Sequence, residues 1–83
     1  MDEKLIDEAL EYGIEFGKQL KKHNINVVVA GQKLNHLQQT NQEKFIEAYL
    51  QLAVQIGITV NKSIAAGDKM LIQSFLIGLS QEF

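Results

Sequence analysis

The chain has 83 residues, 46% of them hydrophobic and 22% charged, which is typical of one globular domain over residues 1–83 and not of a disordered segment. It lacks cysteine, which excludes disulfide bonds and thiolate metal sites, and its longest apolar run, around residues 27–30, is too short to cross a bilayer. The acidic first residues also differ from a signal peptide. We therefore expect a soluble, cytoplasmic protein with no membrane contact.

The net charge of −2 is unevenly distributed along the chain. Residues 1–17 contain six acidic residues and one lysine, whereas residues 18–40 contain four lysines and no acidic residue. All 8 basic residues are lysine. Because arginine is absent, the chain has no planar guanidinium group to contact phosphate or guanine through two hydrogen bonds. Any nucleic-acid contact must use the point charges of lysine side chains.

The first predicted helix covers about residues 2–22, with Asp2 near its start. Acidic residues occupy its first turns and lysines its last turns, as the helix dipole favours. Its apolar residues recur at three- and four-residue steps, at Leu5, Ala9, Tyr12, Phe16 and Leu20.

Small residues mark a second feature of this helix. Ala9, Gly13 and Gly17 lie four residues apart and share one face. Since each glycine inside a helix costs about 1 kcal/mol relative to alanine, this stripe indicates the close approach of another helix backbone.

Residues 23–26 are predicted to form a turn, and a second helix is expected over about 26–38. Its first residues are ambiguous, because the β-branched Val27, Val28 and Val29 favour strands. The helical spacing of Ala30, Leu34 and later apolar residues, without a partner strand elsewhere, favours the helix.

A capping box over residues 40–43, with Thr40 as its cap and Glu43 as its acid, predicts the start of a third helix over about 41–56. The wide apolar arc of this helix, which includes Val54, predicts a central position. Gly57 is placed to end the helix.

Residues 58–67 form a predicted connector with room for one helical turn after Asn61. Asp68 is the expected cap of a fourth helix over about 69–81, which is apolar nearly all round and should be buried on several sides. The predicted fold class is therefore all-α, a small bundle of four main helices.

Catalytic and metal-binding patterns are not found in the sequence. His23 and His36 lie thirteen residues apart without a further ligand at a typical spacing, and the acidic pair Glu11 and Glu15 lies in a run of acidic residues that fits a solvated face. There is no nucleophile motif and no glycine-rich phosphate loop. We expect a protein that is not an enzyme and has no catalytic residue, metal, cofactor or small-molecule substrate.

A positive stripe is the candidate nucleic-acid contact. Lys18, Lys21 and Lys22 share one side of the first helix, and Lys33 and His36 share one side of the second. They would meet phosphate backbones through charge alone, since no aromatic residue lies among them to stack on bases. The competing interpretation is that these lysines complement a helix C-terminus and solvate a face.

A protein interface is the other candidate site. Ordinary core packing explains most of the small-residue stripe and the apolar fourth helix. Four helices in 83 residues can bury only a limited area, however, and a surplus of apolar surface is typical of an interface. The interface residues expected from this argument are Ala9, Gly13, Gly17, Phe75 and Leu79.

Most of the chain resembles the C-terminal helical region of the large subunit of type I-B CRISPR Cascade complexes, and the small subunit that some of these systems make from that gene. The similar features are dispersed apolar and glycine positions in five segments: residues 11–20, 33–37, 41–45, 50–60 and 75–79.

The resemblance implies a non-catalytic helical subunit that stacks with other Cascade subunits and with further copies of itself. Such a subunit stabilises the backbones of the guide RNA and target DNA while base pairing reads the sequence. Carried over to this chain, it makes Lys18, Lys21, Lys22 and Lys33 backbone contacts, although the acidic net charge departs from a basic binder. The alternative is a stand-alone helical module for protein–protein contact, such as a homodimer, without nucleic-acid binding.

Overall fold

The computed structural model of the chain describes residues 3–83, and these residues form helices and no strand. The helices are α1 (Glu3–Lys22), α2 (Val27–Thr40), α3 (Gln42–Ile56), α4 (Lys62–Ala65) and α5 (Lys69–Ser80). α4 is a single turn, so the bundle has four main helices. The prediction of an all-α bundle with four main helices is therefore confirmed. The ambiguous residues 27–30 form the first turn of α2. Asp2, the predicted start of the first helix, lies outside the described residues.

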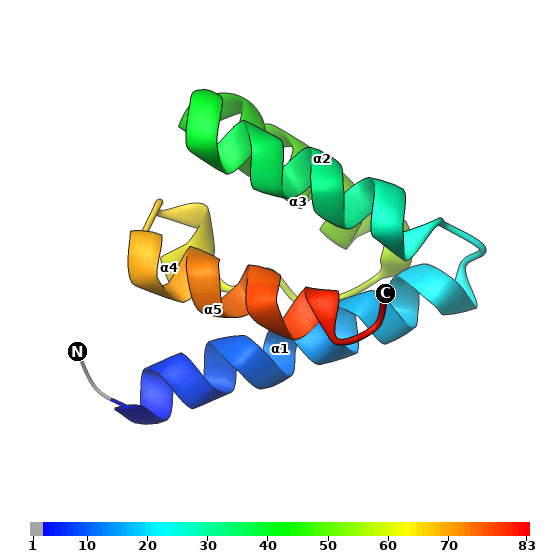
Figure 1. Cartoon of the computed structure of the whole chain (residues 1–83), viewed down its shortest axis with the longest axis horizontal. Coiled ribbons are helices and arrows are strands. Elements are labelled where there is room, and N and C mark those ends of the chain that lie inside the picture. Colours follow the sequence, from blue (N-terminus) through cyan, green and yellow to red (C-terminus); the bar gives the residue numbers. More distant parts are fainter. Residues whose placement is uncertain (1–2) are drawn as a thin grey trace.

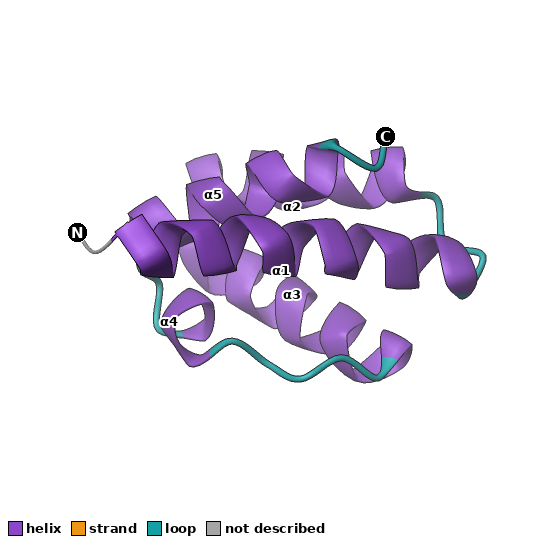
Figure 2. Ribbon diagram, turned by 90° about the horizontal axis from the view of Figure 1, so that it is seen from below, coloured by secondary structure: helices purple, strands orange, loops and turns teal. Residues whose placement is uncertain are grey.

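The four main helices form two layers (Figures 1 and 2). α1 and α5 lie side by side and run in the same direction, while α2 and α3 form an antiparallel pair against them. α3 ends at the same end of the bundle as α1. The chain therefore returns along the molecule through residues 57–61 before α4 and α5 begin, as the long loop in Figure 2 shows.

Glycines bring α1 and α5 into backbone contact. A Cβ atom at Gly13 would lie 2.0 Å from the carbonyl oxygen of Phe75, and one at Gly78 would lie 2.0 Å from the carbonyl oxygen of Leu10. The close helix approach predicted from the small-residue stripe is therefore confirmed. The approaching helix, however, belongs to the same chain.

This contact corrects the predicted protein interface. Ala9, Gly13, Gly17, Phe75 and Leu79 are all buried within the bundle, where the chain's own helices cover them. None of the five is available to another chain in this fold. A four-residue spacing identifies a contact face of a helix, but it does not say which chain supplies the neighbour.

The start of α3 differs from the predicted capping box. Asn41 is the cap, because its side-chain oxygen accepts a hydrogen bond from the Lys44 amide at 3.2 Å. Thr40 is instead the last residue of α2, and its hydroxyl donates to the carbonyl of His36 at 2.9 Å. Asparagine caps a helix at least as well as threonine, and here the extended backbone of Asn41 ends one helix and starts the next.

Three other predicted helix boundaries are confirmed. Gly57 ends α3 with a left-handed backbone, at φ 72°, and the following amide of Ile58 bonds back to the carbonyl of Ala53 at 3.0 Å. Asn61 caps the single turn α4, and Asp68 caps α5 by accepting from the Leu71 amide at 3.2 Å.

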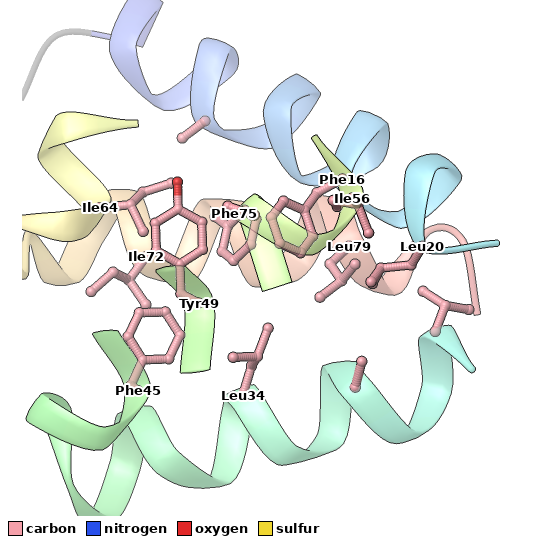
Figure 3. Close-up of a cluster of buried hydrophobic side chains, with 14 of the residues drawn as sticks. Phe16, Leu20, Leu34, Phe45, Tyr49, Ile56, Ile64, Ile72, Phe75 and Leu79 are labelled. Carbon is pink, nitrogen blue, oxygen red and sulfur yellow. The ribbon is translucent and has the colours of Figure 1, made fainter. Parts of the chain in front are cut away.

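Aromatic side chains from both layers form the centre of the core (Figure 3). Tyr49 of α3 lies next to Phe75 of α5, with ring centroids 5.5 Å apart, and Phe16 of α1 meets Phe75 edge to face at 5.1 Å. All three side chains are completely buried. Such contacts add to the apolar burial that holds the two layers together.

α3 is less buried than its sequence predicts. Its inward face consists of Phe45, Tyr49, Ala53 and Ile56, whereas Val54 is 77% exposed. The helix therefore belongs to one of two layers and is not the central element. The composition of the helix predicts a wide apolar arc, but the neighbours in this fold cover only one side of it.

Candidate functional site

The last two turns of α1 carry the three lysines of the predicted nucleic-acid contact. Lys18, Lys21 and Lys22 are all exposed, and at 3.6 residues per turn they lie within one side of the helix. Exposed His23 follows in the turn after the helix. The carboxyl end of a helix favours cations, and here the last turns of α1 hold three lysines, followed by His23, at one end of the bundle.

Lys21 is the one lysine of this group with a recorded ion pair. Its amino group lies 3.5 Å from a carboxylate oxygen of Glu82, which follows α5. The side chain of Glu82 is only 18% exposed, because its carbons pack over Gly17, where a Cβ atom would lie 2.8 Å from them. Glu82 therefore reduces the positive potential at Lys21.

Lys33 and His36 lie on a different element from the α1 lysines. Both are exposed on α2, and Lys33 lines a pocket of about 240 Å³ against α3. Lys33 comes seven residues after the Asn26 cap, which places it about 10 Å along α2 from the turn that follows α1. All five predicted residues are thus exposed, and they lie on two helices as expected; their contact with nucleic acid stays a prediction.

A groove between α2 and α5 was not predicted from the sequence. Its volume is about 430 Å³, and none of the side chains that line it carries a charge. Five side-chain amides surround it, from Gln32, Asn35, Gln38, Gln39 and Gln73. The spacing of Gln32, Asn35 and Gln39 places them on one face of α2, and this pattern is the signal by which the sequence could have indicated the groove.

Apolar side chains form the other part of this α2–α5 groove. Ile77 is 55% exposed and Phe83 is 53% exposed, while Leu76 is partly buried. The ring of Phe83 packs against α2 at Gly31, where a Cβ atom would lie 2.6 Å from it. Half-exposed apolar groups beside uncharged amides suit contact with another protein surface better than contact with phosphate.

Titratable groups do not gather into a reaction centre in the described part of the chain. Over residues 3–83, no three His, Asp or Glu side chains lie together as a possible metal site. Burial, and then the hydrogen bond to Tyr49, raise the pKa of Tyr12 well above its usual value. The Tyr12 hydroxyl donates to the carbonyl of Thr59 at 2.7 Å, so its contacts are those of a structural link.

Within residues 3–83, no helix combines the length and the apolar character needed to cross a membrane. Comparisons with family models, with curated proteins and with solved structures give no match. The resemblance to Cascade small subunits therefore stays a prediction.

Proposed function

We propose that this chain is a non-catalytic small subunit of a type I CRISPR surveillance complex, in the cytoplasm. It stacks with neighbouring subunits and stabilises the backbones of the guide RNA and target DNA by charge contacts that do not depend on sequence. The observation that carries this proposal is the exposed group Lys18, Lys21 and Lys22 at the end of α1, on a helical bundle of the expected class. The resemblance of the sequence supports it.

The proposed mechanism is multivalent. One copy offers few cations, and Glu82 occupies one of them, so a single chain should bind nucleic acid weakly. Several weak contacts on one complex add up, because the second contact forms at a high effective concentration after the first. Base pairing with the guide reads the sequence, and the lysines only lower the free energy of the opened strands.

The first prediction concerns these lysines. Changing Lys18, Lys21 and Lys22 to alanine should weaken the binding of target DNA by the assembled complex. The slope of log affinity against log salt should fall by about 2 for each copy that contacts the DNA, since about one counterion is released per phosphate contact. The measurement is a binding titration at several salt concentrations.

A matched control is available within the chain. Lys44, Lys62 and Lys69 are also exposed, and changing them to alanine removes the same charge from α3, α4 and α5. The first turn of α5 and α4 lie at the end of the bundle opposite to the end of α1 (Figure 1). If both triple variants change affinity equally, or the α1 variant changes nothing, the α1 lysines are not the contact.

A second candidate function is a stand-alone module for protein–protein contact without nucleic-acid binding. The α2–α5 groove favours it, because the side chains that line the groove are uncharged and include the half-exposed Ile77 and Phe83. The two functions differ in the response of the chain to the lysine variant. The module should keep all of its binding when the three α1 lysines are replaced.

A further inference from the structure

Residues 81–83 form a short strap between α1 and α2 (Figure 1). They continue α5 in a tighter turn, because the amides of Gln81, Glu82 and Phe83 each donate to a carbonyl three residues earlier. This turn directs Glu82 toward α1 and Phe83 toward α2. We call these three residues the 81–83 strap.

Two glycines make room for the strap. A Cβ atom at Gly17 of α1 would lie 2.8 Å from side-chain carbons of Glu82, and one at Gly31 of α2 would lie 2.6 Å from the ring of Phe83. A larger residue at either position would displace these side chains, because a packed interior has no spare room for a methyl group. The strap is therefore held at two points beyond its attachment to α5.

The packed strap fixes the position of one carboxylate. The carboxylate of Glu82 lies 3.5 Å from the amino group of Lys21. The Glu82 side chain is mostly buried, whereas the Lys21 side chain is half exposed. A surface ion pair usually loses much of its energy to the ordering of two long side chains, but here one of the two is ordered by its packing.

A phosphate group that approaches Lys21 meets two obstacles from this carboxylate. It must replace the carboxylate as the partner of the lysine, and it is repelled by the negative charge of Glu82. Because the carbons of Glu82 are held against Gly17, the carboxylate cannot simply turn away into water.

We propose that the 81–83 strap is an autoinhibitory contact, which holds the carboxylate of Glu82 where a phosphate group would otherwise bind Lys21. The Lys21–Glu82 ion pair and phosphate binding at Lys21 then exclude each other, so the strap weakens the binding of phosphate by the free chain. This inference rests on the proposed function for the nature of the ligand, a nucleic-acid backbone, and it adds the regulation of that site.

An NMR titration of the full chain with oligothymidine, at about 0.1 M salt, tests the proposal. Glu82→Gln keeps the shape of the side chain and removes its charge, so it should bind about twofold to fivefold more tightly than wild type, the range of a surface ion pair. This gain should disappear when Lys21 is alanine, because the carboxylate then has no lysine to occupy. Circular dichroism of the same samples checks that the fold is kept.

Phe83→Ala is an independent variant, because it loosens the strap without changing a charge. It should also tighten binding. The matched controls are Glu47→Gln and Val54→Ala, which remove an exposed acidic and an exposed apolar side chain from α3. Each control should leave the affinity within about 1.5-fold of wild type, since salt screens charges that are far apart.

Four results would overturn the proposal. Glu82→Gln or Phe83→Ala binds like wild type, Glu82→Gln keeps its gain in the absence of Lys21, Glu47→Gln gains as much as Glu82→Gln, or the chain binds neither oligothymidine nor tripolyphosphate. The second of these would mean that Glu82 acts through the net charge and not through the ion pair.

Tripolyphosphate is the second probe because it separates this proposal from the proposed function. A gain of Glu82→Gln toward tripolyphosphate, together with an assembled complex whose DNA binding does not depend on the α1 lysines, supports the strap and contradicts the nucleic-acid contact. Lysine-dependent DNA binding with a silent Glu82→Gln toward both probes has the opposite meaning.

Discussion

At the scale of single residues, two tyrosine hydroxyls fix the connector that crosses the bundle. The Asn61 amide donates to the Tyr49 hydroxyl at 2.8 Å, the two hydroxyls lie 2.5 Å apart, and Tyr12 donates to the Thr59 carbonyl. Because each hydroxyl has one proton, Tyr49 must donate to Tyr12. This chain of bonds holds residues 59–61 between α1 and α3, and so directs the chain toward α4.

Tyr49→Phe should lower the free energy of unfolding by about 1–3 kcal/mol, because the Asn61 amide then loses its partner beside the core. Tyr12→Phe should cost less, since the exposed Thr59 can be reached by water. Urea denaturation of the three proteins measures both changes. Equal stability of Tyr49→Phe and wild type would show that the connector is held by other contacts.

The raised pKa of Tyr12 also predicts that the free energy of unfolding depends on pH. Burial raises its pKa, so the folded chain keeps a proton that the unfolded chain releases near pH 10. The stabilisation is complete below about pH 10 and is lost as the pH rises above this value. The free energy of unfolding should therefore fall above pH 10 less steeply in Tyr12→Phe than in wild type, and parallel curves would contradict the assignment.

The residue scale also shows where the sequence is a limited guide. Asp68, Asn61 and Gly57 were predictable because each had the appropriate chemistry at one position only. At the start of α3, Thr40 and Asn41 both had capping chemistry. The choice of Asn41 depends on the path of the chain out of α2, which local sequence does not record.

At the scale of elements, the backbone contact between α1 and α5 is the defining feature. Gly13→Ala should destabilise the fold by about 3 kcal/mol, because the added carbon overlaps the Phe75 carbonyl and the two helices must separate. Gly57→Ala is the control, since open space surrounds this position and only its left-handed backbone disfavours alanine, by about 1–2 kcal/mol.

Thermal denaturation followed by circular dichroism compares the two variants. A Gly13→Ala protein as stable as Gly57→Ala would mean that α1 and α5 do not touch through their backbones. The small-residue stripe predicts this contact from sequence, since mid-helix glycines need a reason. It cannot distinguish a neighbour within the chain from one outside it, and this is why Gly13 and Phe75 were assigned to a protein interface.

At the scale of the whole molecule, the lysines at the end of α1 and the uncharged side chains of the α2–α5 groove lie on different surfaces. The lysines at the end of α1 were predictable from their spacing, because helix periodicity fixes which side chains share a side. The amides on one face of α2 could be found in the same way, but their position beside α5 could not, because it depends on the packing of two helices that are remote in sequence.

The recovery of a tagged copy of this chain from the cells that make it tests the proposed function most directly. The measurement is the identity of the protein and RNA that co-purify at moderate salt. The account predicts the subunits of a type I CRISPR complex together with guide RNA, and a reduced yield of target DNA when Lys18, Lys21 and Lys22 are alanine. Recovery of the chain alone, or with proteins that carry no guide RNA, would contradict it.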